Sequence, residues 1–244
     1  MVTLTRIARW TGAAYLALAI AGMAGFLLVR PLLHVAGDPE ATLVNLTQHS
    51  SLAYLGLTLE LLIVLAQAVA AVGFYALFRG DRPVAAYAVA TFGMANATTI
   101  LASAAMLATA LGVAGDGVAP AADPAATVAL LYAISDGFWS VGGVFFGLWL
   151  IPMGWFMIST SRMPRVLGWI LVIGGVGYVV SALLGANPEV PGIMLDALAF
   201  PATVAELGTI GYLLIRGIRS ARPQEALGSP SSAETRLVER VSIG

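Results

Sequence analysis

The sequence predicts an all-α polytopic membrane protein that forms a single bundle of six transmembrane helices. Of its 244 residues, 59% are hydrophobic and only 10% are charged, whereas soluble domains carry about 25% charged residues. Its mean hydropathy is +0.90. The apolar residues also fall into six segments of about 20 residues or more, which is the length that an α-helix needs to cross the hydrocarbon core. We therefore expect one transmembrane domain over residues 1–220 and a polar, disordered cytoplasmic tail over residues 221–244.

Helix stop and start signals set the limits of the six predicted spans. We expect Arg30-Pro31 to end the first span, and a polar connection to follow it. In that connection, Asp38 and Pro39 are typical of an N-cap and a first helical residue, which predicts a short extracytoplasmic surface helix over residues 39–49. The expected spans are about residues 10–29, 52–78, 84–113, 126–158, 166–184 and 194–215.

The fourth span is too long for a bilayer. A helix that starts after Asp123-Pro124 and continues to Ile158 is roughly 50 Å long, compared with about 30 Å for the hydrocarbon core. It must therefore tilt, protrude or break, and Gly137 and Pro152 are two places where it can bend.

Arginine distribution predicts the orientation in the membrane. All twelve basic residues are arginines, and in a six-helix arrangement only Arg30 lies on the extracytoplasmic side. Both termini are therefore expected in the cytoplasm, and the first helix is expected to be retained rather than cleaved. The heavy use of Arg, Ala and Gly suggests a GC-rich bacterium, and hence its inner membrane. The cytoplasmic arginines are Arg6, Arg9, Arg79, Arg82, Arg162, Arg165, Arg216, Arg219, Arg222, Arg236 and Arg240.

Four acidic residues within the spans are the candidates for chemistry. They are Glu60, Asp136, Asp196 and Glu206. We place all four in the outer half of the bundle, where the sequence offers no Arg or Lys at the same depth. A carboxyl group there costs about 2.5–3.5 kcal/mol on insertion scales and should face inward toward hydrogen-bond donors. Without a cation nearby, burial favours the protonated form. The acids can therefore act as proton donors.

Polar and aromatic residues at similar depth are the candidate substrate-binding groups. Aromatic faces stabilise cations, and amides hydrogen-bond polar groups. The alternative is that Glu60, Gln67, Asn96 and Glu206 only form hydrogen bonds between helices, each worth about 0.6 kcal/mol. Trp149 is either the floor of a cavity or part of the core. The candidate binding residues are Gln67, Asn96, Trp139, Phe146, Trp149, Tyr178 and Asp196.

The sequence gives no signal for a metal or a cofactor. It has no Cys, and its two histidines, His34 and His49, lie outside the predicted spans. There is no HExxH, GxSxG or Walker A motif, and no DDxxD pair that would hold a magnesium diphosphate. We expect no cofactor and no nucleic-acid partner. The oligomeric state stays open.

Three segments resemble a bacterial family of six-helix membrane proteins known only as a domain of unknown function. They are RIARWTGAAYLAL near the start, VFFGLWLIPMGWFMISTSRMPRVLGWILVIGGVGY in the middle, and AELGTIGYLLIRGI near the end. The resemblance covers about residues 5–220 and implies the six-helix fold. Glu206 falls where that family tends to have an acid, and Trp149 stands where it often has a histidine.

The architecture is also similar to that of small integral-membrane terpene cyclases. Those enzymes lack aspartate-rich motifs and use one acid early in the chain and another in a late helix; Glu60 and Glu206 match these two places. The likeness implies an enzyme that protonates and cyclises an isoprenoid, with Asp136 or the second glutamate accepting the final proton. A small proton-coupled transporter and a lipid-binding scaffold are the alternatives. The expected partners are an isoprenoid-like molecule and membrane lipid.

Overall fold

The computed structural model describes residues 2–115, 122–185, 187 and 189–219. Its described residues form helices and no strand, and six helical segments are long and apolar enough to cross a membrane. This confirms the predicted all-α, six-span fold. The predicted tail at residues 221–244 lies outside the described residues.

The five later spans lie within two residues of the expected limits. They are α4 (Ser50–Phe78), α5 (Pro83–Ala114), α6 (Pro124–Thr160), α7 (Arg165–Leu184) and α8 (Gly192–Ile215). Each begins or ends at Pro, Gly or Arg residues that were visible in the sequence. Between the first span and α4 lies a shorter helix, α3 (Pro39–Gln48).

The first span is longer than predicted. It consists of α1 (Val2–Met23), a π-helical turn η1 (Ala24–Val29) and α2 (Arg30–Leu33). The expected stop at Arg30-Pro31 is therefore wrong. Pro31 directly follows the π-helical turn, and the helix continues through it to Leu33. As a result Arg30 remains on the helix.

The helix α3 starts as the sequence indicates, with the side chain of Asp38 accepting a hydrogen bond from the Ala41 N–H at 2.9 Å. Thr42 and Leu46 are buried, and α3 packs on the first turns of α6. Its predicted place at a membrane surface stays a prediction.

The long span α6 is one unbroken helix. Its 37 residues include Pro152, and at 1.5 Å per residue it is roughly 55 Å long. Because it does not break, it must tilt or extend beyond the hydrocarbon core.

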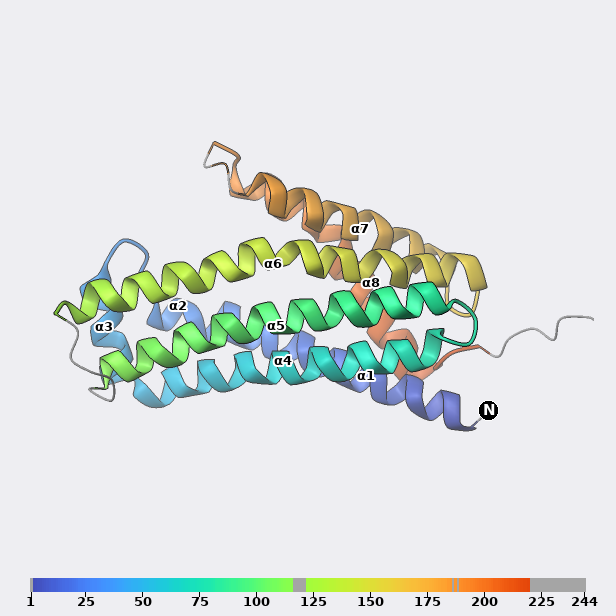
Figure 1. Ribbon diagram of the computed structural model, residues 1–244, viewed down its shortest axis with the longest axis horizontal. Coiled ribbons are helices and arrows are strands. Elements are labelled where there is room, and N and C mark those ends of the chain that lie inside the picture. The colour runs from blue at the N-terminus through green and yellow to red at the C-terminus, as the bar shows by residue number, and fades with distance from the viewer. Residues whose placement is uncertain (1, 116–121, 186, 188, 220–244) are drawn as a thin grey trace, which may run out of the picture.

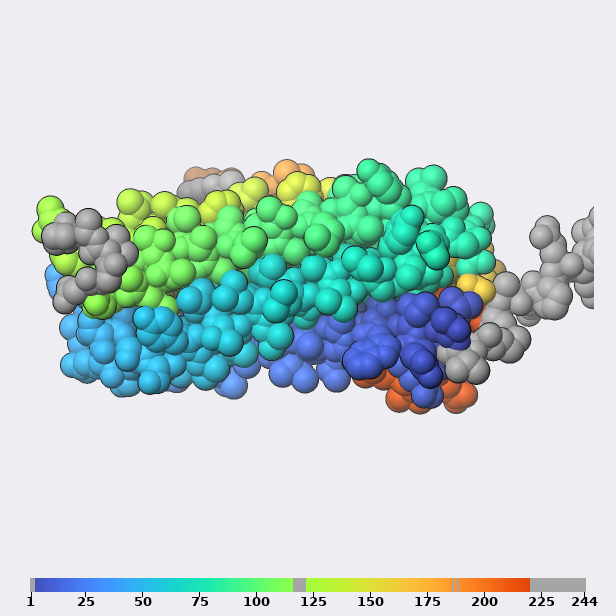
Figure 2. Space-filling model, turned by 60° about the horizontal axis from the view of Figure 1, so that its bottom comes forward, coloured from blue at the N-terminus to red at the C-terminus, as the bar shows by residue number. Residues whose placement is uncertain are grey.

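The six spans form a closed ring. Going round it, α1 packs on α4, α4 on α5, α5 on α6, α6 on α7, and α7 on α8, which returns to α1 (Figure 1). Along one face of the molecule, α4 and α5 lie side by side over the whole length (Figure 2). The N-terminus and the C-terminal end of α8 lie at the same end (Figure 1). We call this the arginine-rich end, and the end that carries Arg30 the opposite end.

Glycines bring α6 and α7 close together. A Cβ atom at Gly147 would collide with the backbone carbonyl of Gly175, and one at Gly154 would collide with that of Gly168. Such small residues let helix backbones approach closely. Here they hold α6, with its aromatic residues, against α7.

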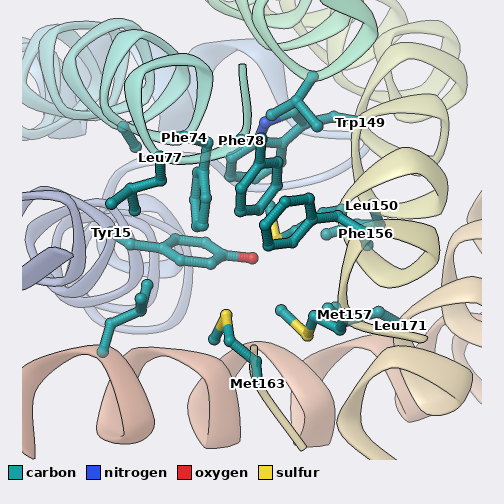
Figure 3. Close-up of a cluster of buried hydrophobic side chains, with 14 of the residues drawn as sticks. Tyr15, Phe74, Leu77, Phe78, Trp149, Leu150, Phe156, Met157, Met163 and Leu171 are labelled. Carbon is teal, nitrogen blue, oxygen red and sulfur yellow. The ribbon is translucent and has the colours of Figure 1, made fainter. Parts of the chain in front are cut away.

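An aromatic core fills the arginine-rich half of the ring. The rings of Phe78 and Phe156 stack with their centroids 3.6 Å apart, and Trp149 lies edge-on to Tyr15 at 5.1 Å (Figure 3). A separate cluster, which includes Val29, Leu33, Leu46, Val128 and Tyr132, fills the opposite end.

Candidate functional site

Glu60 is held by donors from two other helices. It is 5% exposed, and its Oε1 accepts hydrogen bonds from the Ser103 hydroxyl at 2.6 Å and from the Trp139 indole N–H at 3.0 Å. The Ser103 hydroxyl is also 2.8 Å from that of Ser135. Both donors contact Oε1, so Oε2 has no hydrogen bond within the part of the chain that the structure describes. We call these four residues the Glu60 group.

Ser103 and Ser135 were not among the predicted site residues. Isolated serines within apolar spans usually bond to their own helix, as several threonines do here. The signal that could have found Ser135 is its place directly before Asp136, on the span singled out for its acid and aromatic residues.

A small cavity of about 40 Å³ lies beside Glu60. It is also lined by Phe26, Arg30 and Tyr132. The guanidinium carbon of Arg30 lies 5.6 Å from the Phe26 ring centre and 5.2 Å from that of Tyr132. The walls of this cavity therefore include a cation next to the buried carboxyl group.

Arg30 forms an ion pair with Asp136. The expectation that no Arg lies at the depth of the acids is therefore wrong, because the first span continues through η1 and α2 and brings Arg30 to α6. The Arg30 side chain is 15% exposed and that of Asp136 is 50% exposed. Asp136 is thus the more exposed partner of the pair, and it lines none of the three described cavities.

A larger cavity, which we call the chamber, has a volume of about 190 Å³. It lies between α1, α4, α5, α6 and α7. It shares Phe26 and Ile63 with the small cavity, so the two are neighbours. Five of the seven predicted binding residues line the chamber: Gln67, Asn96, Trp139, Phe146 and Tyr178.

Aromatic rings and amides form the chamber wall. The Phe146 and Tyr178 ring centroids are 4.9 Å apart, and those of Phe26 and Trp139 are 4.4 Å apart. Trp139 connects the chamber to Glu60, because its ring lines the chamber while its N–H bonds the carboxyl group.

Gln67 makes no hydrogen bond. Its side chain is 0% exposed, and neither its amide nitrogen nor its amide oxygen has a partner. The interhelical hydrogen bond that we considered for Gln67 is therefore absent. A buried amide with two unsatisfied polar atoms is unfavourable, and among the described residues Gln67 is the side chain whose two polar atoms both lack a partner.

Glu206 belongs to a different region. It accepts a hydrogen bond from the Tyr15 hydroxyl at 2.5 Å. Tyr15 points into the aromatic core among Phe74, Phe78 and Trp149 (Figure 3). Glu206 lines none of the three cavities described, so the structure does not bring it to one cavity with Glu60.

Two predicted binding residues also lie away from these cavities. Trp149 is 0% exposed and belongs to the core, where its indole N–H has no partner. Asp196 is exposed near the start of α8. The third cavity, an open groove of about 550 Å³ between α5 and α6, lies beside Arg82 and Trp155.

The sequence matches a family model described as a domain of unknown function (DUF4386) over residues 10–217. No curated protein and no solved structure gives a match. Because the match spans all six membrane helices, the chain belongs to the DUF4386 family.

Proposed function

We propose that this protein is an intramembrane enzyme that binds an isoprenoid-like molecule in the chamber and protonates it from Glu60. The observation that carries the proposal is the hydrogen bond from Trp139 to Glu60, which ties a buried carboxyl group to an aromatic chamber wall. Both donors contact one oxygen of Glu60, which leaves the other oxygen available to carry a proton.

Local charge supports Glu60 as the acid. Asp136 balances the positive charge of Arg30, so Glu60 has no cation of its own. A carboxyl group that is buried without a counter-ion is more stable in its neutral form. Asp136 is half exposed and paired with Arg30, so it is not the acid in this proposal.

The proposed reaction is an isomerisation without net consumption of protons. Protonated Glu60 gives its proton to one carbon of an alkene, and a carbocation forms at the other carbon. The π-electrons of a second double bond attack this cation and close a ring. Loss of a proton to the glutamate carboxylate then gives the product and restores the acid. Aromatic faces from Trp139, Phe146 and Tyr178 stabilise the cation meanwhile.

Glu206 has a structural role in this proposal. It is partly exposed, and its one hydrogen-bond partner is Tyr15, a residue of the aromatic core. Its position outside the three cavities supports a contribution to packing between α1 and α8.

A product profile tests the proposal. The chain is expressed in a bacterial host supplied with prenylated and epoxy-prenyl precursors, and lipid extracts are compared by mass spectrometry. General acid catalysis contributes about 10²–10⁴-fold, so Glu60→Gln should lower the yield of an isomeric product at least about 100-fold. Glu206→Gln, made at equal membrane levels, is the matched control and should keep most of it. Equal loss in both variants would contradict the assignment to Glu60.

A proton-coupled carrier is the second candidate. The observation that favours it is the π-helical turn η1, which lines the small cavity beside Glu60. Irregular helices of this kind are frequent at functional sites and at the binding sites of transporters. A carrier would move a lipophilic solute unchanged, so Glu60→Gln would abolish proton-coupled uptake while no new product formed.

Orientation follows from the arginines. Eight of them in the described residues lie at the arginine-rich end, and Arg30 lies at the opposite end. By the positive-inside rule the arginine-rich end faces the cytoplasm of a bacterial inner membrane, with both termini inside. In this orientation the Arg30–Asp136 pair faces the extracytoplasmic side.

A further inference from the structure

Gln67 offers a donor and an acceptor that nothing in the described protein uses. Its side chain is fully buried, both amide atoms lack partners, and it lines the chamber. Leaving a buried polar group without a partner carries a desolvation penalty. Both amide atoms are almost inaccessible as placed, so a ligand that supplies an acceptor and a donor removes this penalty once the amide turns toward the chamber.

A second amide stands in the same wall. Asn96, which is 4% exposed, lines the chamber from α5 while Gln67 lines it from α4. A hydroxyl group is the smallest group that both donates and accepts. It can donate to one amide oxygen while it accepts from an amide N–H.

The chamber contains no group that would balance a negative charge. Its lining residues include no Arg, Lys or His; they are apolar or aromatic apart from Gln67, Asn96, Thr99 and the Tyr178 and Trp139 polar atoms. A diphosphate carries several negative charges, and burying them without cations is strongly unfavourable. A diphosphate group is therefore disfavoured inside the chamber.

Volume limits what the chamber holds. A cavity of 150 Å³ binds benzene, so the chamber, at about 190 Å³, has room for about eight non-hydrogen atoms by the same scale. That corresponds to one isoprene unit with its hydroxyl group and the start of the next unit. The chamber is not fully enclosed, and the rest of a longer chain can pass through its opening.

From these four observations we infer that the ligand of the chamber is an uncharged isoprenoid alcohol and not its diphosphate ester. Gln67 binds the hydroxyl group of this alcohol. This inference rests on the proposed function only in taking the chamber as a ligand site. Gln67 is then a specificity-determining residue, separate from the acid Glu60.

Equilibrium dialysis of the full-length protein in lipid nanodiscs tests the inference, with protein-free nanodiscs correcting for partition into lipid. The probes are geraniol, its methyl ether, the hydrocarbon myrcene and geranyl diphosphate. Geraniol should bind more tightly than the ether and the hydrocarbon, and the diphosphate should not compete with it. Gln67→Leu should weaken geraniol binding about tenfold, as the loss of the hydroxyl contacts implies, and leave myrcene binding unchanged.

Controls keep the test decisive. Gln48→Leu makes the same change at an exposed position of α3 and should leave binding unchanged, and Gln67→Met replaces Gln67→Leu if the latter does not fold. No binding of geraniol to the wild type, equal binding of the diphosphate, or an unchanged geraniol affinity in the Gln67 variant would each overturn the inference.

The same samples separate this inference from the proposed function. If geraniol binds through Gln67 but the protein converts no isoprenoid, the proposed reaction fails and the inference stands. If a product forms through Glu60 while Gln67→Leu binds and converts as the wild type does, the inference fails and the proposed reaction stands.

Discussion

Two glutamates within one ring of helices occupy different environments: Glu60 is buried and Glu206 is partly exposed. Glu60 accepts two hydrogen bonds, borders a cavity and lies near the Arg30–Asp136 pair. Glu206 accepts one hydrogen bond, from Tyr15 of the aromatic core, and lines none of the three cavities. The proposed chemical role of Glu60 and the proposed structural role of Glu206 rest on this difference.

The difference lies in what surrounds each carboxyl group. Around Glu60, small side chains such as Ser103 and Ser135 and the neighbouring cavities leave space for another molecule. Glu206 bonds to Tyr15, and the Tyr15 ring packs among the large rings of Phe74, Phe78 and Trp149 (Figure 3). A buried acid needs an adjacent space before it can act on a substrate, and only Glu60 borders a described cavity.

Removing a hydroxyl group that donates a hydrogen bond to each glutamate should give the largest difference in unfolding free energy between the two regions. Tyr15→Phe leaves Glu206 without its partner, and we expect a loss of about 1–2 kcal/mol in unfolding free energy. Ser103→Ala leaves Trp139 still bonded to Glu60, and we expect a loss of about 0.6 kcal/mol. Both are measured by reversible unfolding in mixed detergent micelles.

Thr98→Val is the control for that comparison, because the Thr98 hydroxyl is exposed and bonds only to its own helix. If Ser103→Ala destabilised the protein more than Tyr15→Phe, the contrast between a structural and a chemical glutamate would be lost.

A smaller effect is expected from pH at the opposite end. Burial lowers the pKa of His34 below its usual 6.5; the Asp136 carboxylate opposes this shift and Arg30 adds to it. His34 therefore binds a proton less readily in the folded state. Its contribution to stability is complete above about pH 6.5 and is lost as the pH falls from there through the folded-state pKa. Thermal unfolding between pH 7.5 and 5 should show this loss, and it should be smaller in His34→Gln.

The matched variant for His34 is His49→Gln, which changes an exposed histidine at the end of α3 and should keep the wild-type pH dependence. An identical pH dependence in wild type and His34→Gln would show that other groups dominate in this range.

Much of the fold was predictable because membrane spans follow from local rules. Apolar length and flanking Pro, Gly and Arg residues located α4 to α8 within two residues. The predicted end of the first span was wrong because a proline near a helix end usually indicates a stop. Here a π-helical turn precedes Pro31, and the helix continues through it.

Less of the site was predictable because it depends on which helices are neighbours. Depth along each span brought five predicted binding residues to one chamber. Depth does not tell which face of a helix turns inward, so Trp149 lies in the core and Glu206 lies outside the three cavities instead. The Arg30–Asp136 pair joins residues 106 positions apart, and it could be found only once the end of the first span was known.

Proton transfer from Glu60 is the central claim, and the origin of the product's new hydrogen tests it most directly. Purified protein in nanodiscs prepared in D₂O is given the precursor that it consumes in cells, and the product is examined by mass spectrometry and NMR. The carboxyl proton of Glu60 exchanges with solvent, so the account predicts one deuterium at the protonated carbon with the wild type and no product with Glu60→Gln. A product without deuterium at that carbon, or undiminished product from Glu60→Gln, would contradict the claim.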